Sequence, residues 1–168
     1  MPDLHHAAVR AVDLVNAEPA DVPAVLVAHG ETNLTGLAAE REQLHGVLAE
    51  LRALLAITDR SEAAVRLNSL LTRHATIPQL VRHEGWDWHL HVDRVDDTWS
   101  NWLASSAALA LAGRLTARSN VPWGTCAAHG CARAFLDDGH GGTRRYCSPV
   151  CATRQRVRDH RTVRRNRP

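Results

Sequence analysis

The chain contains no lysine, and its twenty basic residues are all arginine. Aromatic residues make up 4% of the 168 residues, and five of the seven are tryptophan. We interpret the missing lysine first as a compositional bias of the genome and only second as a functional selection. Hydrophobic residues still account for 45% of the chain, which suffices for one ordinary domain with a core and one small module.

Signals for crossing a membrane are also missing. The first residues, Met-Pro-Asp-Leu-His-His, lack the basic and apolar regions of a signal peptide. The most apolar window, 104–112, is far shorter than the roughly 20 residues that span a bilayer. We therefore expect a cytoplasmic protein that has no membrane partner.

Motifs of the common catalytic sites do not occur in the sequence. It has no Gly-x-Ser-x-Gly nucleophile motif, no glycine-rich phosphate loop and no His-Glu-x-x-His. We therefore expect no enzymatic activity and no catalytic residues.

Charge is distributed unevenly along the chain. Residues 1–125 contain ten arginines and fifteen acidic residues, a net charge of −5, whereas residues 126–168 contain ten arginines and three acidic residues, a net charge of +7. An acidic body with a basic end indicates a nucleic-acid or acidic-partner surface at that end.

Apolar residues recur at helical spacing through most of the first 120 residues. The pattern predicts a helix from Leu4 to Asn16, a short helix from Asp21 or Val22 to His29, a third through Leu37–Leu55, a fourth from Asp59 to about His74, and a last from about Asp97 to Arg118. Asp59 three residues before Glu62 is typical of a capping box.

One segment has the two-residue period of a strand instead. Apolar and polar residues alternate from Trp86 to Asp93, and Gln79–His83 is its predicted partner across a Glu84-Gly85 turn. The predicted fold class is α+β and mostly α: a helical body with a small antiparallel β-hairpin, then a C-terminal four-cysteine module that ends in a basic helix. The predicted domains are residues 1–120 and residues 121–168, joined by a linker at 119–122.

The tryptophans fall into two pairs, Trp86 with Trp88 on one strand face and Trp99 with Trp102 on one helix face. Core packing is the ordinary role of such residues. The alternative is an aromatic pocket for a small-molecule effector. His89 and His91, with Asp87 and Asp93, could similarly bind a metal or form an exposed polar face.

All four cysteines lie in the C-terminal region, as Cys126-x4-Cys131 and Cys147-x3-Cys151 with fifteen residues between the pairs. Zinc favours four tetrahedral ligands and is well served by thiolates. In a reducing compartment, paired cysteines more often bind metal than form disulfides. We predict one structural Zn²⁺ held by all four, with two disulfides, unbound thiols or an iron–sulfur cluster as alternatives. His129 and His140 lie in the same module and could compete as ligands.

The spacer and the second pair contain further local signals. Residues 132–137 are a predicted strand that returns, after a glycine turn, through Arg144-Arg145-Tyr146. Ser148 suits a helix N-cap and Pro149 suits the first helical position. Cys151 would then lie in the first turn, where free N–H groups and the helix dipole favour its thiolate.

These residues resemble the CGNR zinc-finger family. The resemblance rests on the two cysteine pairs, Phe135-Leu136-Asp137, Arg144-Arg145-Tyr146-Cys147-Ser148 and Cys151-Ala152-Thr153-Arg154. The segment 11–16 is similar to the start of the alanine-rich, helical ABATE domain that precedes the finger in that family. The resemblance implies a stress-induced transcriptional regulator. Ala152-Thr153 stands where the family signature has Gly-Asn.

The basic end has a helical arrangement of its own. Arg154, Arg158, Arg161 and Arg165 follow i, i+4, i+7, i+11 and share one helix face. Guanidinium groups bind phosphates bidentately and can read guanine in a major groove. We predict that these four arginines, together with Arg144 and Arg145, bind nucleic acid; a solvated basic tail that aids solubility is the alternative.

The sequence therefore predicts a DNA-binding transcriptional regulator whose body supplies dimerisation or effector sensing. Two other functions stay open. One is a protein-interaction adaptor in which the zinc finger is purely structural and the arginines bind an acidic protein partner. The other is a small-molecule sensor with a tryptophan-lined pocket in the body.

Overall fold

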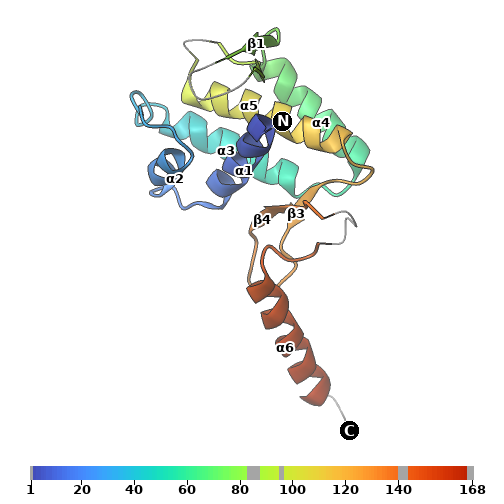
Figure 1. Cartoon of the computed structure of the whole chain (residues 1–168). Helices are drawn as coiled ribbons and strands as arrows, with labels where there is room; N and C mark the ends of the chain where they lie inside the picture. Colours follow the sequence, from blue (N-terminus) through green and yellow to red (C-terminus); the bar gives the residue numbers. More distant parts are fainter. Residues whose placement is uncertain (1, 83–87, 95–96, 140–143, 166–168) are drawn as a thin grey trace.

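The computed structural model describes residues 2–82, 88–94, 97–139 and 144–165 (Figure 1). Its helices are α1 (Pro2–Asn16), α2 (Val22–Ala28), α3 (Arg41–Leu55), α4 (Arg60–His74), α5 (Trp99–Thr116) and α6 (Pro149–Arg165). Its strands are β1 (Gln79–Val81), β2 (His89–His91), β3 (Trp123–Thr125) and β4 (Ala134–Leu136). The predicted fold class, a mostly helical α+β protein with a four-cysteine region that ends in a helix, is confirmed.

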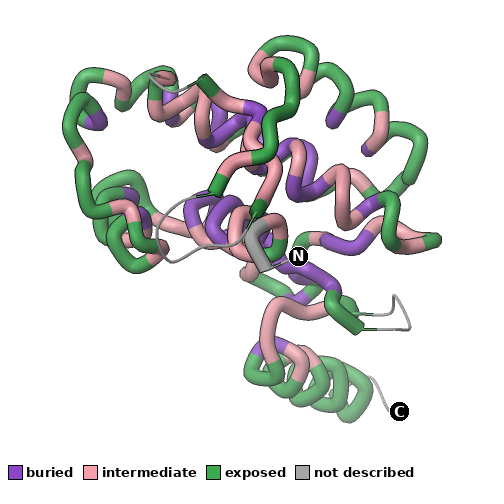
Figure 2. Tube along the Cα trace, turned by 45° about the horizontal axis from the view of Figure 1, so that its top comes forward, coloured by how far each residue is buried: buried purple, intermediate pink, exposed green. Residues whose placement is uncertain are grey.

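Helix α5 is the centre of the body and contacts α1, α3 and α4. Its small side chains, among them Ala104, Ala107 and Ala108, are completely buried, so the neighbouring helices approach closely. Leu111 of α5 and Leu51 of α3 are also fully buried, and each such leucine contributes roughly 1.5–3 kcal/mol. Figure 2 shows the buried residues on the inward faces of these helices.

Local signals in the sequence set two of the helix starts. The Asp59 side chain accepts a hydrogen bond from the Glu62 amide at 2.8 Å, as the capping pattern predicted. Thr98 caps α5 in the same way through the Asn101 amide at 3.2 Å. Each such cap contributes about 1 kcal/mol.

The body hairpin pairs β1 with β2 antiparallel, with Leu80 opposite Leu90. This confirms the predicted hairpin, although its strands are shorter than the alternating pattern. The predicted Glu84-Gly85 turn and Trp86 lie outside the described residues.

A second antiparallel pair, β3 with β4, was not predicted. Trp123 lies opposite Leu136, and both are buried in the same core as the helices. The predicted return of the chain runs through residues 144–146, which form no strand; the ladder partner of β4 is the upstream β3. Arg145 contributes one backbone bond, from the Ala127 amide to its carbonyl at 2.8 Å.

Side chains of the body also hold this hairpin. Asn16, the last residue of α1, donates from Nδ2 to the Ala134 carbonyl at 2.9 Å and accepts from the Ala134 amide at 2.8 Å. Arg114 of α5 forms an ion pair with Asp138, just after β4. The hairpin is thus packed on the body, and whether residues 121–168 fold as a separate domain stays a prediction.

Within the part of the chain that the structure describes, no helix is long and apolar enough to cross a bilayer.

Candidate metal centre and basic helix

The first cysteine pair lies in a tight loop directly after β3. The Cys126 amide donates to the Arg133 carbonyl at 2.9 Å, and the Cys131 amide donates to the Ala128 carbonyl at 2.9 Å. Gly130 takes a φ of 72°, a left-handed conformation that glycine adopts without strain. The turn at Gly130 brings Cys131 back toward Cys126.

The second pair spans the start of α6. The Ser148 hydroxyl accepts a hydrogen bond from the Cys151 amide at 3.2 Å, and Pro149 is the first helical residue. This is the N-cap arrangement that the sequence predicted, and it places Cys151 in the first turn of α6.

The four sulfurs converge on one point. The Sγ atoms of Cys131 and Cys147 lie 3.8 Å apart, and those of Cys147 and Cys151 lie 3.6 Å apart. All four ligand atoms lie within 4.8 Å of one another. A tetrahedron of sulfurs about 2.3 Å from zinc has edges of about 3.8 Å. None of the four cysteines is in a disulfide. The donor set and spacing therefore fit one Zn²⁺ with a complete shell of four thiolates.

Crowded thiols differ in how readily they ionise, because neighbouring negative charges repel. Burial and the hydrogen bond with the Cys151 sulfur raise the pKa of Cys147 to about 12. Burial also acts to raise the pKa of Cys126, but hydrogen bonds from the backbone at Cys147 and Ala128 outweigh it and lower that pKa to about 7. A divalent cation between the sulfurs would favour the thiolate form of all four.

Polar groups around the cluster tie α6 to the first loop. The Gln155 side chain accepts a hydrogen bond from the His129 amide at 2.8 Å. The Arg154 guanidinium lies 3.6 Å from the Cys151 sulfur, so a positively charged group contacts the cluster. Gln155 was missed by sequence reasoning, because a glutamine in a basic helix carries no recognisable signal.

Helix α6 extends away from the body (Figure 1). The structure describes all of its residues, and Cys151 is the one that is buried. Arg158, Arg161 and Arg165 are exposed on it, so the structure brings together the predicted helical set. Arg154 shares this face but also contacts the metal cluster.

The other two predicted nucleic-acid residues have different surroundings. Arg144 donates to the carbonyls of Tyr146 at 3.0 Å and Leu136 at 2.9 Å, and also to that of Cys147. Its guanidinium lies 5.0 Å from the centroid of the Phe135 ring. Arg145 is exposed and lies over the Tyr146 ring at 5.8 Å.

The predicted effector residues are brought together only in part. The rings of Trp99 and Trp102 meet edge to face with centroids 5.4 Å apart. Trp88 is 63% exposed, and Trp86 lies outside the described residues. The predictions for an effector pocket of these four residues and for nucleic-acid binding stay predictions.

His89 and His91 do lie side by side, with their Nε2 atoms 3.0 Å apart. Among the described residues, however, the four cysteines are the one group of three or more side chains whose ligand atoms could hold a metal ion. Asp87 and His140 lie outside the described residues.

Comparison with known proteins agrees with this geometry. No curated protein matches the chain. The family model of the CGNR zinc finger matches residues 123–164, a stretch that includes both cysteine pairs and nearly all of α6. Residues 123–164 therefore resemble the CGNR zinc finger, and their four cysteines form its zinc-binding centre.

Proposed function

We propose that this protein binds DNA through α6 and regulates transcription, with the zinc centre holding the base of that helix. The observation that carries the proposal is the composition and exposure of α6. Its seventeen residues include six arginines and one aspartate, and Cys151 alone among them is buried. A helix with so few packed side chains contributes little to the core, whereas its charge suits a polyanion.

The dimensions of α6 support binding in a groove. Seventeen residues make a helix about 25 Å long, and the major groove of DNA admits a helix. Arg158, Arg161 and Arg165 follow one face and would contact phosphates or guanine edges along it.

The metal centre supports the proposal by fixing the direction of α6. Three contacts act within its first two turns: the Ser148 cap, the Cys151 thiolate and the Gln155 bond to the His129 amide. A helix fixed at its base presents its basic face in one orientation relative to the body.

The test is a triple substitution of Arg158, Arg161 and Arg165 to alanine. We expect the variant to lose retardation of duplex DNA while it still binds one zinc per chain. For wild type, about five phosphate contacts give a log–log salt slope of about −4 to −5, and loss of three contacts makes that slope shallower by about 3.

The matched control replaces three exposed arginines of the body, Arg41, Arg66 and Arg82, and so removes the same charge elsewhere. Its DNA affinity should stay near that of wild type. Equal losses of DNA affinity in both variants would show that net charge alone determines binding, and would overturn the role of α6. Binding of an acidic polypeptide but not of DNA would favour the adaptor function instead.

A further inference from the structure

Helix α6 carries three exposed valines among its arginines. Val150 is 74% exposed, Val157 is 45% exposed and Val163 is 64% exposed. An exposed valine gains little from burial, and its branched side chain makes it a weaker helix former than alanine or arginine. The folding of the helix therefore does not account for valine at these positions, whereas contact with a partner would.

The valines belong to two different faces of α6. Side chains three, four and seven residues apart share one face of a helix. Val157 follows Arg154 by three residues, precedes Arg161 by four and follows Val150 by seven. Val150 and Val157 therefore lie on the side of the helix that carries the arginines predicted to bind nucleic acid.

Val163 lies on the other side of the helix. It follows Asp159 by four residues and His160 by three. Asp159 is the one acidic residue of α6, and its carboxylate accepts a hydrogen bond from the Gln155 side chain at 2.8 Å. Gln155 in turn accepts from the His129 amide of the first cysteine loop. The acidic side of the helix is thus the side tied to the metal region, which leaves the side with the arginines and two valines for a polyanion.

The major groove of DNA presents partners for both kinds of side chain. Guanine offers two acceptors that pair with a guanidinium, and thymine offers a methyl group that contacts apolar side chains. A helix face that combines arginines with valines therefore matches guanine and thymine together. The major groove of an RNA duplex is too deep and narrow for side chains to read, so the same face does not suit it.

We infer that Val157 contacts thymine methyl groups in the major groove of duplex DNA, and that Val150 extends this apolar contact toward the base of α6. The inference rests on the proposed binding of DNA by α6 and adds a base preference to it. Arg158 and Arg161 bind phosphates or guanine beside the valine and hold it against the base edges.

The probes are two pools of random-sequence DNA duplexes, one made with thymine and the other with uracil, each with its own label. The pools differ only by the methyl group. They compete for full-length, zinc-loaded protein, and the ratio of the two labels in the retarded band measures the preference. We expect wild type to prefer the thymine pool about fourfold, the effect of burying one methyl group.

Val157→Ala is the decisive variant, and Val163→Ala is its matched control. Val157→Ala should lower the preference for the thymine pool below about twofold, because it removes the methyl groups that reach the base. Val163→Ala removes the same atoms from the other side of the helix and should keep the preference of wild type. Alanine favours the helix more than valine does, so neither variant should unfold α6, and zinc content and circular dichroism verify this.

The outcomes separate this inference from the proposed function. Retardation of both pools without a preference by wild type would overturn the inference and leave DNA binding by α6 intact. A preference that Val157→Ala retains, or that Val157→Ala and Val163→Ala lose equally, would do the same. Failure of wild type to retard either pool would overturn both the inference and the proposed function.

Discussion

Arg144 and Arg145 are neighbours in the sequence, but they have different surroundings. The Arg144 guanidinium bonds to three backbone carbonyls and lies near the Phe135 ring. It thereby connects the end of β4 to the loop that carries Cys147. Arg145 contributes its carbonyl to the fold and keeps its side chain at the surface. We therefore expect Arg144 to stabilise the metal region and Arg145 to be available to a partner.

Alanine substitution separates these two roles. Arg144→Ala should destabilise the zinc-loaded protein by roughly 1–2 kcal/mol, because a charged donor is lost from three carbonyls. Arg145→Ala should change stability by less than about 0.5 kcal/mol. Chemical denaturation of the two variants measures both values, and equal losses would contradict the distinction.

Asp138 gives a prediction about pH. Its hydrogen bond and ion pair with Arg114 hold the pKa of the carboxyl below its ordinary value. The ion pair therefore stabilises the protein above that ordinary value, and the stabilisation is lost as the pH falls through the lowered pKa. Asp138 is largely exposed, so Asp138→Asn should cost at most about 0.5 kcal/mol at pH 7.

Melting curves at a series of pH values test this prediction. The difference between wild type and Asp138→Asn should shrink toward zero in acid, below the ordinary pKa of the carboxyl. A stability difference between the two proteins that stays constant from pH 7 into acid would show that it does not arise from ionisation of Asp138.

Residues with strong local signals were predicted correctly, and residues that act through the tertiary fold were not. The cysteine spacing, the Ser148-Pro149 start and the Asp59 cap each depend on neighbours within a few positions, so the sequence contains them. The buried ion pair of Arg10 with Glu31 was missed, although an arginine on the apolar face of an alanine-rich helix is a readable signal. The role of Asn16 depends on Ala134, more than a hundred residues away, and no local pattern encodes that pairing.

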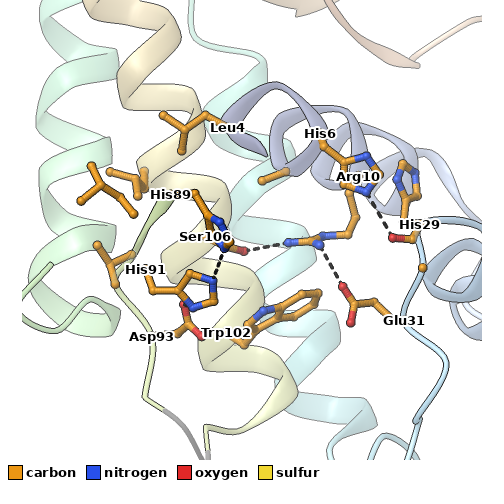
Figure 3. Close-up of a pocket in the computed structure, with 15 residues that line it drawn as sticks. Leu4, His6, Arg10, His29, Glu31, His89, His91, Asp93, Trp102 and Ser106 are labelled. Carbon is orange, nitrogen blue, oxygen red and sulfur yellow. Dashed lines mark hydrogen bonds and ion pairs between the residues drawn. The ribbon is translucent and has the colours of Figure 1, made fainter. Parts of the chain in front are cut away.

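At the scale of elements, α1 joins the two parts of the molecule. Arg10 of this helix pairs with Glu31 in the loop that follows α2 (Figure 3), and Asn16 at its end pairs with β4 of the four-cysteine region. Because a helix is stiff over so few turns, a displacement of α1 near Arg10 would also displace Asn16 and its contacts with β4.

Asn16→Ala tests the docking of β4 on α1. The substitution leaves a partly buried amide and carbonyl of Ala134 without their partner, at a cost of roughly 1–3 kcal/mol. Hydrogen exchange at the Ala134 amide should accelerate more than at amides in α5. Asn68→Ala, at an exposed position of α4, is the control and should alter neither stability nor exchange at Ala134.

For the whole molecule, two different forces hold the four-cysteine region. Trp123, Ala134 and Leu136 of its hairpin belong to the core of the body, whereas Cys126, Ala128 and Cys151 form a separate small cluster. We therefore expect the hairpin to depend on hydrophobic packing and the base of α6 to depend on the metal.

Removal of zinc by a chelator should consequently disrupt only part of the region. We expect amides of α6 to lose protection in hydrogen exchange, while the indole of Trp123 stays buried and the body melts near its original temperature. Cys151→Ser should reproduce the effect without a chelator. Exposure of the Trp123 indole together with the loss of protection in α6 would show instead that the hairpin also needs the metal.

The pairing of Asn16 with Ala134 also bears on solubility. Both backbone groups of Ala134 bond to this one side chain, so they are not offered to the strand of another molecule. Unpaired strand edges are templates for aggregation and for exchange of segments between chains. A single amide at the end of a helix thus shields the outer edge of a two-stranded sheet, and its loss would favour self-association at high concentration.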